Sequence, residues 1–205
     1  MTELFVSALV TFLVVIDPPG CAPIFAGLTQ GTDAAHRRAM AIRSVLIASG
    51  ILLFFGLLGE DLLSALGISL SAFRIAGGIM LFLIALEMVF ERRTERRENR
   101  AQEVSASDHD DISVFPMAIP MIAGPGSIAS IMLLVARSEG LTETLLVFGA
   151  LLLTLVLTLI ALLAAAPLMR LLGHRMEAMI TRILGVILAA LAAQFVIDGI
   201  ERSFS

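Results

Sequence analysis

The sequence contains no tryptophan, no tyrosine and no lysine, and it has a single cysteine, Cys21. One cysteine excludes an intrachain disulfide. The missing tryptophan and tyrosine are the residues that usually mark the two surfaces of a bilayer, so phenylalanine and arginine must take that place. A net charge of −4, with 14 arginines against 18 acidic residues, gives no signature of nucleic-acid binding.

Hydrophobic residues make up 58% of the 205 residues, and the mean hydropathy is +0.96. A soluble domain is about 45–50% apolar. The excess falls into blocks of about twenty residues, the length that crosses a bilayer core of roughly 30 Å. We therefore predict an all-α, polytopic membrane protein with six spans. They cover about 3–28, 40–59, 70–90, 113–137, 141–166 and 179–200.

The arginines orient the predicted spans. Eleven of them lie in or beside the loops after spans 1, 3 and 5, whereas Arg74, Arg137 and Arg202 lie on the other side. By the positive-inside rule the richer side is cytoplasmic. We expect a bacterial inner-membrane protein with both termini outside the cytoplasm. Residues 91–112 then form a charged cytoplasmic linker between a first repeat, 1–90, and a second, 113–205.

The two halves of the sequence resemble each other. The Pro-Gly pair at 19–20 aligns with the pair at 125–126, an offset of 106 residues. Arg74 in "FRIAGGIML" aligns with Arg182 in "TRILGVILA", an offset of 108. Each half has three predicted spans, so the halves must cross the membrane in opposite orientations. Inverted repeats of this kind are typical of secondary transporters.

Helix breakers interrupt the first and fourth spans. "VVIDPPGCAPIF" places Asp17 and its prolines near the middle of the apolar stretch 4–28, and "AIPMIAGPGSI" interrupts the stretch 114–136. A proline inside a helix costs about 3 kcal/mol, and an aspartate at mid-membrane roughly 2.5–3.5 kcal/mol. Broken backbone is tolerated at membrane depth only where protein or a polar cavity satisfies it. We predict that helices 1 and 4 are broken near the midplane.

Two half-helices that begin at these breaks would present free N–H groups and positive dipole ends. Such ends bind a carboxylate without a basic side chain, and Ser127 would add a hydroxyl. Asp17 would accept an ammonium group, a proton or a sodium ion, or it would only cap the next half-helix. Thr154 and Thr158 share one helix face, where they either line the cavity or bond to their own helix. The competing hypothesis is that the breaks are kinks that serve packing alone.

Nothing in the sequence indicates catalysis. His36, His109 and His174 all fall in predicted loops, and there is no zinc-binding histidine pair or phosphate-binding loop. We expect a protein that is not an enzyme and has no metal and no cofactor other than a coupling H⁺ or Na⁺. Its expected partners are a small solute and the lipid bilayer, and the residues leave open whether it forms a homo-oligomer.

"DPPGCAPIF" and "FPMAIPMIAGPGSI" resemble the paired signatures of the MarC family of integral membrane proteins. The resemblance covers the whole chain, and it implies transport of small neutral amino acids within a wider superfamily of amino acid and ion exporters. One departure is Cys21, which stands where the family usually has asparagine. The site that the resemblance implies comprises Asp17, Pro18, Gly20, Pro23, Pro120, Gly124, Pro125, Gly126 and Ser127.

Together these observations predict a secondary transporter of small neutral amino acids, such as glycine, alanine or serine, coupled to H⁺ or Na⁺. An ion or metabolite exporter on the same scaffold is the first alternative. A membrane protein that does not transport, and whose breaks are dry, is the second.

Overall fold

The computed structural model describes residues 2–92, 96 and 111–204. In these residues the chain forms helices joined by turns and contains no strand. Five helices are long and apolar enough to cross a membrane, or six if η1 and α6 form one span. Most of the predicted linker, 91–112, lies outside the described residues. The helices are α1 (Thr2–Ile16), α2 (Pro18–Leu28), α3 (Ala34–Ala65), α4 (Leu70–Val89), η1 (Ser113–Ile122), α6 (Pro125–Val135), α7 (Leu141–Leu163) and α8 (Ala165–Ser203).

Capping residues fix where the helices begin. The Asp33 carboxylate accepts a hydrogen bond from the His36 amide at 2.8 Å at the start of α3, and the Ser69 hydroxyl accepts one from the Ala72 amide at 3.1 Å at the start of α4. Side-chain acceptors at this position satisfy amides that have no partner inside the helix. Because the cap and not the apolar boundary sets its start, α3 begins before the predicted 40–59. It also continues beyond that range at its C-terminal end.

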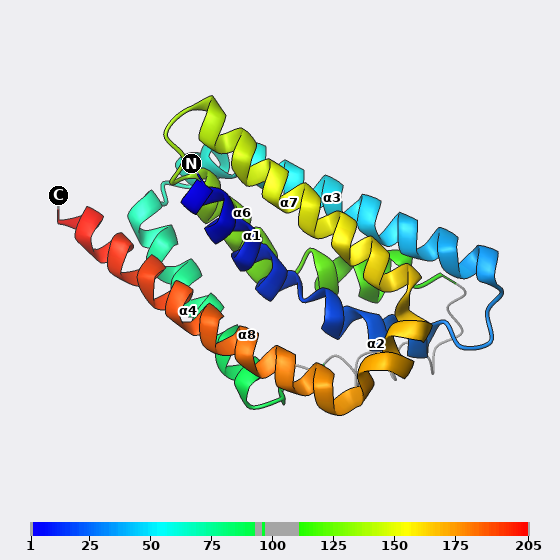
Figure 1. The fold of residues 1–205 in the computed structure, drawn as a ribbon. Helices are drawn as coiled ribbons and strands as arrows, with labels where there is room; N and C mark the ends of the chain where they lie inside the picture. The colour runs from blue at the N-terminus through cyan, green and yellow to red at the C-terminus, as the bar shows by residue number, and fades with distance from the viewer. Residues whose placement is uncertain (1, 93–95, 97–110, 205) are drawn as a thin grey trace.

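The helices lie side by side along one long direction, and the chain reverses direction at each turn (Figure 1). Both termini lie at the same end, which we call the termini end. The opposite end, where α2 ends, α4 ends and η1 begins, is the linker end. At this end the amide and hydroxyl of Ser113 both donate to Asp111, which also pairs with Arg43. The Ser113 hydroxyl is the main cause that lowers the pKa of Asp111, and Arg43 adds to it.

Glycines allow α4 and α8 to pack closely. A Cβ added at Gly185 would lie 2.9 Å from the Met88 Cβ and 3.1 Å from the Ala85 carbonyl oxygen, and one at Gly78 would lie 2.9 Å from the Ala192 carbonyl oxygen. Small residues at such crossings are the usual means by which helices associate in lipid, where burial of apolar surface gives no driving force. This crossing therefore joins the last helix of each half of the chain.

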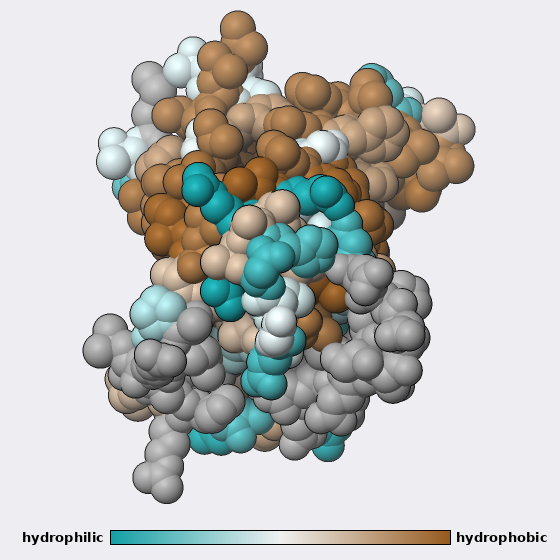
Figure 2. Space-filling model, turned by 90° about the vertical axis from the view of Figure 1, so that its right-hand side faces the viewer, coloured by the Kyte–Doolittle hydropathy of each residue, from teal (hydrophilic) through white to brown (hydrophobic). Residues whose placement is uncertain are grey.

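The outer surface is apolar where a membrane would cover it. Leucines on different helices are largely exposed, with Leu57 at 65%, Leu152 at 63% and Leu83 at 56%. Figure 2, which looks onto the linker end, shows hydrophilic residues gathered on this end face and hydrophobic residues above and behind them. Lipid tails solvate such surfaces as water solvates a polar one, so the protein is a multi-pass integral membrane protein.

The Gly185→Leu variant should lower the unfolding temperature, because its side chain would overlap the backbone of α4. Overpacking of this kind costs about 1–3 kcal/mol, or a fall in Tm of roughly 3–10 °C for a chain of this size. Gly50→Leu is the control, since a Cβ there has no neighbour within 4 Å. Cys21 is 0% exposed, so a thiol-reactive dye reports unfolding in detergent. Equal Tm values for the two variants would contradict the packing described.

Candidate functional site

The first interruption is a single residue, Asp17, between α1 and α2. Its backbone is left-handed, with φ 59° and ψ 67°, and it is 2% exposed. Aspartate and asparagine adopt this conformation more readily than other residues that carry a Cβ. The Asp17 carboxylate accepts a hydrogen bond from the Gly20 amide at 3.1 Å. The N-terminus of α2 is thus closed by its own capping residue.

The residues after Asp17 fit this cap. A Cβ at Gly20 would lie 2.2 Å from Oδ2 of Asp17, so any other residue would push the carboxylate away. The Cys21 thiol donates to the Ile16 carbonyl at 3.4 Å. That carbonyl is the one to which the Gly20 amide would donate in an unbroken helix. The Cys21 thiol therefore supplies a donor to a carbonyl that the break leaves without its helical partner.

The second interruption is longer and bends the chain. The two helices on either side of it, η1 and α6, are inclined to each other by 51°. Within η1, Phe115 and Ile119 have extended backbone because each precedes a proline, a position that disfavours the helical region. At the end of the break a Cβ on Gly124 would lie 2.4 Å from the Pro120 carbonyl oxygen, so this turn requires glycine.

The N-terminus of α6 differs from that of α2 because no side chain caps it. Gly124 holds the cap position without a side-chain acceptor, and Pro125 follows as the first helical residue. The amides of Gly126 and Ser127 belong to the group that has no acceptor inside a helix. Ser127 is 2% exposed, and it lies in the first turn of this uncapped helix. This helix end therefore offers several unused donors.

These donors face a cavity of about 280 Å³. A Cβ on Gly126 would lie 2.6 Å from Cδ1 of Ile84 and 3.1 Å from Cγ1 of Val15, so glycine allows these two side chains of the cavity wall to pack against α6. The cavity is lined by Val15, Ile84, Arg96, Pro116, Pro120, Met121, Gly124, Pro125, Gly126 and Ser127.

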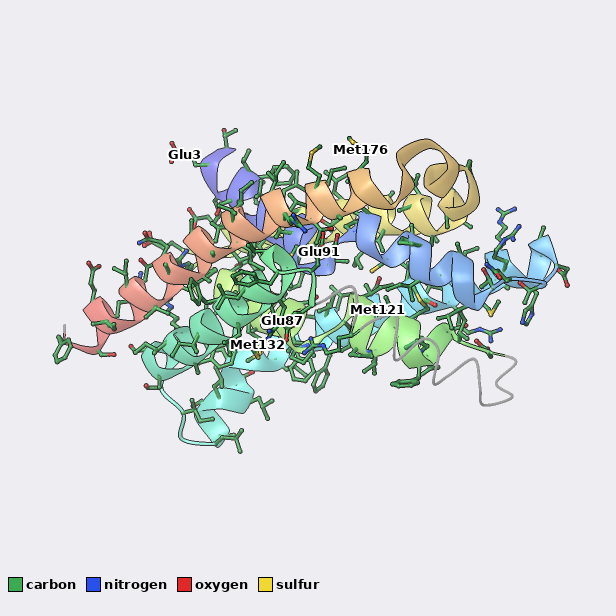
Figure 3. All side chains as sticks on the ribbon, turned by 90° about the horizontal axis from the view of Figure 1, so that it is seen from below. Glu3, Glu87, Glu91, Met121, Met132 and Met176 are labelled. Atoms are coloured by element: carbon green, nitrogen blue, oxygen red, sulfur yellow. The ribbon has the colours of Figure 1, made fainter. Side chains whose placement is uncertain are left out.

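Arg96 forms the side of the cavity toward the linker end. Its side chain is 55% exposed and pairs with Glu87 at 2.8 Å. Figure 3 shows Met121 of η1 and Glu87 of α4 in the same part of the molecule, far from Glu3 at the termini end. The uncapped helix N-terminus adds a positive partial charge to the cavity, whereas Glu87 balances the charge of Arg96. The described lining residues contain no carboxylate.

The structure brings together only part of the predicted site. Pro120, Gly124, Pro125, Gly126 and Ser127 all line the cavity. Asp17, Pro18, Gly20, Cys21 and Pro23 do not line it, although Val15 of the same span does. Thr154 and Thr158 are buried on α7, where their hydroxyls donate to the carbonyls of Ala150 at 2.9 Å and Thr154 at 2.8 Å. The α7 threonines therefore bond to their own helix, which is one of the two alternatives considered for them.

Several lining residues were not predicted from the sequence. Pro116 lies four residues before Pro120, so its proline spacing was a usable signal. Val15 and Ile84 give no such signal, since they are apolar residues in apolar spans. Arg96 belongs to a charged segment that reads as a solvated linker, and only the folded chain places it against the cavity.

The fold and the cavity define a class: a multi-pass helical membrane protein with an interior cavity of small-solute size. Within that class the chain belongs to the MarC family of integral membrane proteins, whose family model matches residues 2–204. It is 37% identical over 199 residues to a UPF0056 membrane protein of Methanocaldococcus jannaschii, covering 97% of each chain. It is 35% identical over 196 residues to the UPF0056 inner membrane protein YhgN of Escherichia coli K12, covering 96% of this chain and 95% of the other. No solved structure matches the chain.

Substitutions at Asp17 distinguish two roles that the sequence left open: capping of α2, and binding of a cation or proton by the charged carboxylate. Asparagine can accept the same hydrogen bond in the same backbone conformation, so Asp17→Asn should keep the free energy of unfolding within about 0.5 kcal/mol of the wild type. Asp17→Ala removes the acceptor and strains the backbone, and it should cost about 1–3 kcal/mol. Denaturant unfolding followed at the Cys21 thiol measures both. A large loss in Asp17→Asn would show that the charge, and not the cap, stabilises the break.

Proposed function

We propose that the protein is a secondary transporter of small neutral amino acids, with glycine, alanine and serine as the first candidates. The observation that carries the proposal is the uncapped N-terminus of α6 facing a cavity that the buried Ser127 also lines. Helix amides and a hydroxyl in a site shielded from water are a carboxylate receptor. The volume of about 280 Å³ lies below the ~300–1,000 Å³ range of pockets for drug-sized ligands, which suits a small solute.

The proposed scaffold is a pair of inverted three-helix repeats. Three helix contacts made by the first broken span have counterparts made by the second. In the first span, α1 packs on α7, and α2 packs on α7 and α8. In the second span, η1 packs on α3, and α6 packs on α3 and α4. The opposite course of the matching helices in Figure 1 supports the same proposal. In transporters of this design the solute site lies at the junction of the repeats, near the bilayer midplane, where broken helices meet.

We assign coupling to Asp17. It is the only acidic residue among those described that is buried, and an ionisable residue inside a membrane protein is a functional candidate because its burial is costly. A proton or a sodium ion at this carboxylate would compete with the hydrogen bond from the Gly20 amide. Ion binding at Asp17 would thus change the start of α2, on the span that also supplies Val15 to the cavity.

For orientation we propose that the linker end is cytoplasmic. The described arginines at this end include Arg37, Arg38, Arg92 and Arg182, and an excess of arginine marks the cytoplasmic side. Both termini would then lie on the other side of an inner membrane, the location that the name of the relative YhgN gives for that protein. In this orientation the side of the cavity that Arg96 forms faces the cytoplasm.

A second candidate is an exporter of small organic anions. The observation that favours it is the charge of the cavity, which has Arg96 and a helix N-terminus but no carboxylate among its described lining residues. A monocarboxylate would need no partner for an ammonium group. Counterflow of radiolabelled propionate and alanine in the same proteoliposomes separates the candidates, since a zwitterion transporter favours alanine and an anion exporter favours propionate.

Radiolabelled alanine flux in proteoliposomes under an imposed proton or sodium gradient tests the main proposal. Ser127→Ala should raise the apparent KM for alanine roughly 10–100-fold, because a hydrogen bond to a charged group contributes about 1.5–3 kcal/mol. Gly126→Leu should abolish flux by filling the cavity. Ser49→Ala is the matched control, since the Ser49 hydroxyl donates to the Val45 carbonyl of its own helix at 2.7 Å.

Asp17→Asn should fold normally and lose the dependence of flux on the gradient. If Ser127→Ala and Gly126→Leu both transport alanine like the wild type, the cavity is not the solute site. If flux in Asp17→Asn still follows the gradient, coupling resides elsewhere.

A further inference from the structure

Two arginines that match in the internal repeat lie in different surroundings. Arg74 of α4 is 1% exposed, and its Nη2 donates to the Ala136 carbonyl, at the C-terminus of α6, at 2.8 Å. Arg182 of α8 is its counterpart at an offset of 108 residues. Its side chain is 55% exposed and pairs with Glu91 at 2.5 Å. The matching arginine side chains are thus buried in the first half of the chain and exposed in the second.

Further contacts surround the end of α6 at which Arg74 lies. Next to Ala136, the Arg137 guanidinium pairs with Asp198 and lies 4.3 Å from the centre of the Phe195 ring. Gln194 donates to the same aspartate at 2.7 Å. These contacts join the C-terminal end of α6 to α4 and α8, and arginines at a helix C-terminus complement its dipole. The half-helix whose N-terminus faces the cavity is therefore held at its other end by two arginines.

The end at which Arg182 lies is the end where Arg96 lines the cavity. There Glu91, just after α4, pairs with Arg182, and Glu87 of α4 pairs with Arg96 (Figure 3). The side chains of the Arg182–Glu91 pair are 55% and 42% exposed, and pairs exposed to this extent contribute little to stability. The buried arginine thus lies where α6 is joined to α4 and α8, and the exposed arginine lies where Arg96 lines the cavity.

We propose that Arg74 and Arg182 are alternating gates, one closing each end of the transport path. In the opposite state Arg182 leaves Glu91 and donates to a carbonyl at the C-terminus of α2, while Arg74 leaves the Ala136 carbonyl. The offsets of 106 and 108 residues place the counterpart of Ala136 at 28–30, where α2 ends at Leu28. The inference rests on the inverted repeat of the proposed function.

The helix contacts and the buried Nε of Arg74 are consistent with such an exchange. Helix α8, which carries Arg182, already contacts α2, as α4 contacts α6. At the termini end the Nε of Arg74 is buried without a hydrogen-bond partner among the described residues. An unpaired buried donor is costly, which keeps the closed arrangement from being permanent.

Thiol labelling from each side of the membrane tests the gates. The reporter is Ile84→Cys, on the cavity wall, in a Cys21→Ser background, with a membrane-impermeant reagent added at the linker end or the termini end of oriented vesicles. Arg74→Gln should raise the labelling rate from the termini end at least tenfold and lower it from the linker end. Arg74→Lys, which keeps a donor, should restore most of the wild-type pattern.

The opposite variant and the control complete the test. Arg182→Gln removes an exposed side chain and should fold; it should abolish labelling from the termini end and leave labelling from the linker end unchanged or faster. Arg202→Gln is the control, since it removes an exposed positive charge at the termini end and should label like the wild type.

Opposite shifts in the two variants support alternating gates. Faster labelling from both ends in Arg74→Gln would show a loosened bundle and overturn the proposal, as would labelling of Arg182→Gln like the wild type. The labelling assay needs no substrate. Opposite labelling shifts without alanine flux would therefore overturn the choice of substrate alone, and alanine flux without these shifts would overturn the gates alone.

Discussion

The arrangement depends on how the chain satisfies backbone amides where helices begin inside an apolar bundle. In lipid an unpaired amide costs several kcal/mol, because no water is present to accept its hydrogen bond. The two breaks solve this problem differently. At α2 the Asp17 carboxylate accepts from the Gly20 amide. At α6 no side chain takes that place, and the cavity supplies the space for an acceptor. In the proposed function, the carboxylate of the solute is the acceptor for this helix end.

In the proposed function, this difference gives the two halves of the chain separate tasks. The second half would hold the anion receptor, with Gly126 and Ser127 at its centre. The first half holds Asp17, whose carboxylate is part of the backbone break and lies outside the cavity lining. The two sites are linked through Val15, which lies two residues before Asp17 and packs so closely against Gly126 that a Cβ there would lie only 3.1 Å from Cγ1 of Val15. A change at the cap of α2 therefore reaches the solute site through packing, without direct contact between the carboxylate and the solute.

Much of the fold could be predicted from local signals. Span lengths follow from hydropathy, and both interruptions fall where proline, glycine and aspartate stand in apolar runs. The second motif supplied five lining residues because prolines and glycines at a break must surround it. Arg96 and the burial of Arg74 against Ala136 could not be predicted, since both depend on helices distant in the sequence. Nor did the sequence distinguish a capped break at Asp17 from an open one at Gly124.

The most direct test of the account is equilibrium binding of radiolabelled alanine to the purified protein, with propionate and ethylamine as competitors. Propionate keeps the carboxylate of alanine and lacks its ammonium group, whereas ethylamine keeps a charged amine and lacks the carboxylate. If the free amides of α6 and Ser127 hold the solute by its carboxylate, propionate displaces alanine and ethylamine does not, and Ser127→Ala weakens alanine and propionate alike. Displacement by ethylamine but not by propionate would contradict the assignment of this helix end as the solute site.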